Sequence, residues 1–136
     1  MKMGLAISLF LFTSFLNLAI AGQTSAAAVT MLMQQNLTPL DNQEALVLTV
    51  RYEAGGSSKP HRHNADVFVY MLEGSVVMQI EGGKEVILKP GETFHESRDD
   101  VHTVSKNASA IEPATFLVFI IKDKNVSATL PIQAGH

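Results

Sequence analysis

The chain has 136 residues, 13 acidic and 10 basic side chains, and a formal net charge of −3. This length favours one domain, and the mild acidity without a basic run argues against a nucleic-acid-binding protein. The sequence has no cysteine, so we expect no disulfide, and any metal site must use histidine, carboxylate or amide ligands.

The first 21 residues have the pattern of a secretory signal peptide. Lys2 precedes the apolar run GLAISLFLFTSFLNLAIA, which ends in Ala19-Ile20-Ala21; a positive start, an apolar middle and a small-x-small end are typical of such peptides. A transmembrane anchor has a similar length, but the polar GQTSAAAVT that follows favours cleavage after Ala21. We expect a periplasmic or secreted protein that contacts the membrane only through the uncleaved signal peptide. The mature chain would have 115 residues and, without Lys2, a charge of −4.

The rest of the chain divides into an N-terminal arm or edge strand (22–44), a barrel (45–124) and a C-terminal tail (125–136). Runs of β-branched and apolar residues, separated by Gly, Pro, Asn or Asp, predict strands throughout the barrel. In chain order these runs are ALVLTVRY, DVFVYMLEG, SVVMQIEGG, KEVILKPG, VHTVSKN and TFLVFIIKD. Short strands at fairly even spacing indicate an antiparallel sandwich or barrel, and EGGK between two of them predicts a hairpin turn.

Two of these runs, VFVYML and FLVFII, are apolar at both odd and even positions. Side chains alternate between the two faces of a sheet, so both faces of these strands favour burial. One face would fill the barrel. A second sheet, the N-terminal arm or another copy of the chain must cover the other face, and we expect a homodimer.

The stretch PHRHNADVFVYMLEG places His61 and His63 just ahead of an apolar strand. Residues i and i+2 of an extended chain point to the same side, so both rings can reach one ion. His102, at the start of a later strand, is the leading candidate for a third ligand. Imidazole nitrogens suit iron, zinc, manganese, nickel or copper. A lone His-x-His also fits two ordinary surface histidines, so this pattern alone leaves both interpretations open.

The spacing of glycines and histidines resembles the two motifs of the cupin superfamily. The first pattern consists of Gly55, His61, His63 and Gly74, and the second of Gly91, His102 and Asn107. VYMLEG and KPGETF are similar to core stretches of small single-domain (type-2) cupins, and the resemblance covers residues 49–121. It implies an all-β fold, the antiparallel double-stranded β-helix or jelly-roll-like cupin barrel, often dimeric, with a metal held by His61, His63 and His102.

The chain departs from the family pattern at one metal ligand. The first cupin motif usually has a glutamate where this chain has Val67, and Asp66 would point to the opposite face of the strand. The usual Pro-x-Gly turn of the second motif is replaced by Ser97-Arg98-Asp99. Three outcomes stay open: a three-histidine site with free positions, a carboxylate supplied by Glu96 as fourth ligand or as a neighbour of the ligands, or weak or absent metal binding.

These observations predict an exported single-domain cupin that binds a divalent metal through three histidines and holds a small molecule in its barrel. Val67, Val69 and Met71 would line an apolar pocket, which suits an aromatic or acyl ligand better than a free sugar. As an enzyme, the protein would be metal-dependent and dioxygenase-like or isomerase-like. The alternatives are a non-catalytic module that binds or senses a small ligand or metal, and a metal-free structural barrel.

Overall fold

The computed structural model describes residues 25–38 and 40–132. The predicted signal peptide lies outside the described residues. The described residues form no helix, and their strands are, in chain order, β1 (Ala28–Asn36), β2 (Gln43–Tyr52), β3 (Ser57–Ser58), β4 (His61–Arg62), β5 (Ala65–Glu73), β6 (Val76–Ile80), β7 (Val86–Leu88), β8 (Thr93–Glu96), β9 (Val101–Asn107), β10 (Ala114–Asp123) and β11 (Leu130–Pro131). The predicted all-β class is therefore confirmed.

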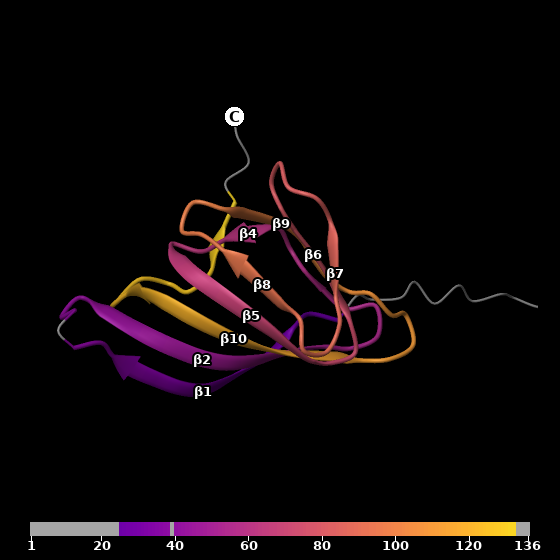
Figure 1. Cartoon of the computed structure of the whole chain (residues 1–136), viewed down its shortest axis with the longest axis horizontal. Coiled ribbons are helices and arrows are strands. Elements are labelled where there is room, and N and C mark those ends of the chain that lie inside the picture. Colours follow the sequence, from indigo (N-terminus) through magenta and orange to yellow (C-terminus); the bar gives the residue numbers. More distant parts are fainter. Residues whose placement is uncertain (1–24, 39, 133–136) are drawn as a thin grey trace, which may run out of the picture.

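The strands form two antiparallel sheets that face each other (Figure 1). One sheet has the order β1-β2-β10-β5-β8. The other has the order β11-β4-β9-β6-β7, with β3 also paired to β9. Most neighbouring strands are far apart in sequence, so the sheets bring together segments that no local pattern connects. The site described below depends on these long-range pairings.

The core lies between the sheets and follows from the alternation of side chains along the long strands. In β10, every second residue is buried, and the residues between them are half-buried. In β5, Ala65, Val67, Val69 and Met71 are buried, while the intervening Phe68 stays 44% exposed. The apolar residues at both parities thus serve two faces, as expected, and the outer face of β5 remains open to solvent in the single chain.

Two glycines with positive φ show how the turns are made. Gly82, in the predicted EGGK turn between β6 and β7, has a φ of 73°. Gly74, after β5, has a φ of 72°, and a Cβ there would lie 2.5 Å from the carbonyl oxygen of Pro113. Glycine is therefore favoured at position 82 only for its backbone conformation. At position 74 it is also favoured because it has no side chain, since the backbone of another segment passes beside it.

The two ends of the described chain both join the sheets. β1 pairs with β2 at the edge of the first sheet, within the segment predicted to be an arm or edge strand. At the other end, Leu130 and Pro131 pair with Arg62 and His61 of β4. The segment from residue 125 onward, expected as a tail, therefore pairs through β11 with the strand that carries the first histidine. Within residues 25–38 and 40–132, no helix is long and apolar enough to cross a membrane.

Candidate metal centre

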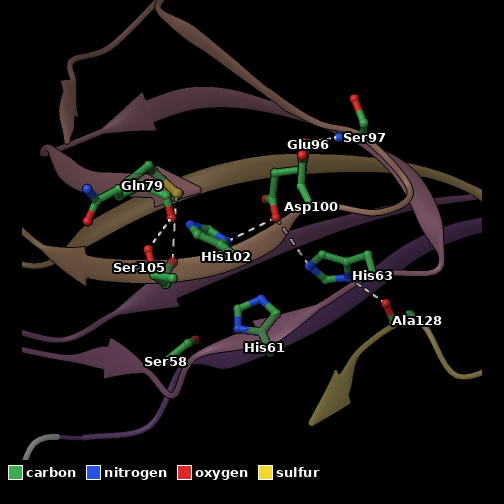
Figure 2. A network of polar contacts seen from close by, with 12 residues as sticks. Ser58, His61, His63, Gln79, Glu96, Ser97, Asp100, His102, Ser105 and Ala128 are labelled. Carbon is green, nitrogen blue, oxygen red and sulfur yellow. Dashed lines mark hydrogen bonds and ion pairs between the residues drawn. The ribbon is translucent and has the colours of Figure 1, made fainter. Parts of the chain in front are cut away.

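Strand pairing brings three histidines together. His61 lies on β4, His63 follows β4 directly, and His102 on β9 is the register partner of His61. One ring nitrogen from each histidine lies within 4.8 Å of those of the other two. The ring centroids of His61 and His63 are 4.9 Å apart, and those of His61 and His102 are 5.1 Å apart. Figure 2 shows the three side chains gathered in one place.

Backbone carbonyls fix the orientation of two of these rings. Nδ1 of His61 lies 2.7 Å from the carbonyl oxygen of Lys59, and Nδ1 of His63 contacts the carbonyl oxygen of Ala128. A carbonyl oxygen only accepts hydrogen bonds, so each Nδ1 must carry the proton. The Nε2 atoms of both rings therefore have a free lone pair, which is the arrangement that metal-binding histidines need.

Glu96 places a carboxylate beside these rings. Its side chain is buried, and Oε2 lies 3.1 Å from Nδ1 of His102 and 3.8 Å from Nε2 of His63. In Figure 2, Glu96 lies between the two rings, joined to each by a dashed line. Glu96 is the register partner of Val67 across β5 and β8. The carboxylate that is missing at Val67 is thus present on the directly opposite residue.

The buried polar atoms of this cluster are not otherwise satisfied. In the described part of the chain, Oε2 of Glu96 and both ring nitrogens of His102 are buried without a hydrogen-bond partner. The 3.1 Å contact between Glu96 and His102 is close enough for an ion pair but poorly aligned for a hydrogen bond. Buried polar groups without partners cost free energy, so they indicate a missing ion or ligand. These residues therefore fit a divalent cation.

The electrostatics favour the protonation states that metal binding requires. Burial lowers the pKa of His61 below its ordinary value, although the Lys59 carbonyl opposes this. Burial raises the pKa of Glu96, but the His102, His63 and His61 rings outweigh it, and the net pKa is lowered. Neutral imidazole and ionised carboxylate are both competent ligands near neutral pH.

The cluster opens onto a cavity of about 160 Å³ inside the barrel. Val67 and Val69 line this cavity together with His63, Glu96 and His102. Met71, expected beside them, is fully buried in the hydrophobic core and is not part of the lining. The walls are mostly apolar, in agreement with the predicted kind of pocket.

Some residues of the site region were not anticipated from the sequence. The Ala128 carbonyl that orients His63 is a backbone atom, and no sequence signal identifies it. The cavity is also lined by Tyr52, Ser58 and Ser105. The only sequence signal for this group was the place of Tyr52 at a core-facing position of β2. His95 is separate from the cluster: its side chain is 48% exposed and lies 3.7 Å from Asp66.

Comparisons with known proteins agree with this fold. Residues 48–120 match the family model described as Cupin domain. A double-stranded β-helix protein from Klebsiella pneumoniae has a TM-score of 0.61 and 17% identity, covering 82% of this chain and 90% of its own. No curated protein matches the sequence.

Two solved enzymes have similar folds. The DMSP lyase DddQ from Ruegeria pomeroyi has a TM-score of 0.55 and 22% identity, covering 61% of this chain and 41% of its own. A recombinant oxalate oxidase in complex with glycolate has a TM-score of 0.55 and 23% identity, covering 74% of this chain and 54% of its own. The chain spans about two fifths to half the length of these enzymes, and at such identities the likeness shows the fold alone.

Proposed function

The chain belongs to the cupin family, and on that premise we propose that it binds a divalent transition metal and a small acidic molecule inside its barrel. One observation carries this proposal: three histidine nitrogens converge beside a buried carboxylate oxygen that has no hydrogen-bond partner among the described residues, and two of these histidines line a cavity. Three imidazoles and one carboxylate form a donor set that suits first-row metals such as iron, zinc, manganese, nickel and copper.

Each residue has a specific role in the proposed centre. His61 and His63 bind through Nε2, because their Nδ1 protons are held by the Lys59 and Ala128 carbonyls. His102 supplies the third nitrogen, and Glu96 supplies a carboxylate from the neighbouring strand. Three neutral rings and one carboxylate leave a net charge of about +1 on a divalent ion. This residual charge favours an anionic ligand in the cavity.

The metal would determine the chemistry. A redox-active metal such as iron would supply oxygenase chemistry, and zinc or manganese would supply Lewis-acid chemistry for isomerase-like or hydrolytic reactions. The apolar walls exclude water and hold the body of the ligand. The names of the similar DMSP lyase and oxalate oxidase refer to small molecules, which supports a small ligand here. A non-catalytic binding or sensing module is the alternative, and it would bind a ligand without turnover.

The first experiment is the metal content of the mature protein, measured by elemental mass spectrometry without a histidine tag. We expect close to one metal ion per chain, lost in the His61→Ala, His63→Ala, His102→Ala triple variant. His95→Ala is the matched control, because this histidine is exposed and outside the cluster. An unchanged metal content in the triple variant, or no metal after reloading with the five candidate metals, would refute the proposed centre.

We also propose that the chain is exported and that the segment up to Ala21 is removed. The support is the sequence pattern of a positive start, an apolar run and a small-x-small end. The intact mass of the protein recovered from the periplasm or medium of a bacterial expression host tests this. A mass corresponding to a chain starting at Gly22 is expected, and a mass that includes the first 21 residues would contradict it.

We propose that a second copy covers the outer face of the first sheet. On β5, Phe68, Tyr70 and Leu72 are 44%, 45% and 40% exposed at alternating positions, so they lie on one face. The ring of Phe68 lies 6.1 Å from that of Phe119 on β10, which extends the apolar face across two strands. Exposed apolar faces of this kind usually mark protein contacts, and a homodimer buries the same face of both copies.

A further inference from the structure

Three hydroxyl groups form a cluster inside the barrel, apart from the histidines. The hydroxyl of Tyr52 lies 2.7 Å from Oγ of Ser58 and 2.7 Å from Oγ of Ser105. Ser58 and Ser105 are register partners on β3 and β9, which places both beside the phenol. All three residues line the cavity that His63 and His102 also line.

A count of protons shows that one hydroxyl proton of this cluster has no strong acceptor within it. Three hydroxyls carry three protons, and the two contacts within the cluster use two of them. Among the described residues, the third proton finds only the sulfur of Met78, 3.8 Å from Oγ of Ser105. A thioether is a weak acceptor. The cluster can therefore donate a hydrogen bond to an oxygen atom of a molecule in the cavity.

The cavity lining fixes the chemical character of that molecule. No lysine or arginine lines the cavity, and apart from the hydroxyls and the metal cluster its walls are mainly aliphatic and aromatic. An anionic group is best placed on the metal, where the only positive charge would be. The group facing the neutral hydroxyls is best a carbonyl oxygen, which accepts without bringing a second charge. The segment between the two groups must be apolar.

The size of the site limits the ligand. A cavity of about 160 Å³ resembles in volume an engineered cavity that holds benzene. His102 and Ser105 lie on either side of an irregularity in the pairing of β9 with β6, and their partners Ile80 and Met78 are two residues apart, which is roughly 7 Å along a strand. The irregularity lets both side chains line the same cavity. The segment that joins the two anchoring groups of the ligand must therefore be a short chain.

We infer that Tyr52, Ser58 and Ser105 form the second anchor of the ligand, and that the ligand is a short oxo acid. Its carboxylate binds the metal of the proposed centre, and its carbonyl oxygen accepts the spare hydroxyl proton. This inference rests on the proposed function and adds the substrate class to it. The hydroxyl cluster binds and orients the ligand, and no chemical step is assigned to it.

The access route agrees with this chemistry. Ala27, Ser58 and Thr129 line both the inner cavity and an open groove on the surface. The groove is also lined by Lys59, whose positive charge attracts an anionic ligand toward the opening. His61 also lines the groove, whereas His63 and His102 line the inner cavity, so a molecule that enters by this route passes Ser58 and His61 before it reaches the other two histidines.

The test compares two acids that differ by one carbonyl oxygen, pentanoate and 4-oxopentanoate, by calorimetric titration into zinc-loaded mature protein. One added neutral hydrogen bond predicts that the oxo acid binds roughly three- to tenfold more tightly. The triple variant Tyr52→Phe, Ser58→Ala, Ser105→Ala should lose this preference and keep its zinc. Replacing all partners of a hydrogen-bonded group by apolar ones of similar shape is nearly neutral for stability, so we expect this variant to fold.

Ser57→Ala is the matched control, because Ser57 lines the outer groove and not the cavity; it should retain the preference. Equal binding of the two acids to wild-type protein, or no binding of either, would overturn the inference while the metal centre stands. A preference that persists in the triple variant would also overturn it. Failure of the wild-type protein to bind zinc or any other candidate metal would instead refute the proposed function.

Discussion

Replacing Glu96 by glutamine tests the proposed centre most directly, because it removes one charge and keeps the shape of the side chain. Oε2 lies 3.1 Å from the nearest nitrogen of His102 and 3.8 Å from that of His63. The carboxylate thus lies next to two of the proposed ligands, and a separation of about 4 Å from a bound ion serves for the magnitude. At an effective dielectric of about 20, one pair of unit charges at that distance contributes about 4 kcal/mol.

The net effect is smaller, because the buried carboxylate loses its hydration whether or not a metal binds. Removing a group that supports metal ligands typically lowers metal affinity 10- to 100-fold, which is about 1.4–2.8 kcal/mol. We expect Glu96→Gln to raise the metal Kd by a factor in this range. Competition with a chromophoric chelator measures the Kd, and Glu85→Gln is the matched control, because Glu85 is exposed.

A second variant separates direct binding from indirect support. Val67 is the register partner of Glu96 and lines the same cavity, so Val67→Glu should place a carboxylate at the same level of the barrel. If Glu96 binds the ion, Val67→Glu combined with Glu96→Gln should recover most of the lost affinity. An unchanged Kd in Glu96→Gln would refute the role of the carboxylate. A loss without recovery would mean that Glu96 acts by orienting His102.

Three further predictions concern the barrel itself. Glu44 contacts Lys122 at 2.6 Å, and this ammonium group, followed by Gln34, lowers the pKa of Glu44 from its ordinary value. A lowered carboxyl pKa stabilises the fold above the pKa of the unfolded chain, and this stabilisation is lost as the pH falls through the lower pKa of the folded protein. Glu44→Gln should therefore lower the Tm at pH 7, and the difference from wild type should vanish well below pH 4.5; a constant difference would contradict this. Gly74→Ala should lower the free energy of unfolding, measured in urea, by more than Gly82→Ala does. The positive φ alone costs alanine about 1–2 kcal/mol at either position, but only Gly74 also faces a neighbouring backbone. Equal losses in the two variants would exclude the close approach. Phe68→Asp should convert a homodimer to a monomer in light scattering with little change in secondary structure, and an unchanged mass would place the dimer contact elsewhere.

The local features of the fold could be predicted from the sequence because they depend on short-range patterns. Alternating apolar residues identify the long strands, and the register of β2, β5 and β10 places their alternate side chains in the core. EGGK specified the hairpin between β6 and β7, where Gly82 adopts a positive φ. The very short strands β3, β4 and β11 carry too few residues for a periodic signal. Pairing with β9 and β4 defines them instead.

The sequence by itself determined the cupin family, the all-β class and the histidines available as ligands, because these depend on residue type and spacing along the chain. Only the tertiary structure decided that Glu96 faces the cluster from the strand opposite Val67, and that carbonyls of Lys59 and Ala128 fix the ring protons. These contacts join residues up to 65 positions apart. Strand register sets them, and register results from the packing of the whole barrel rather than from any local pattern.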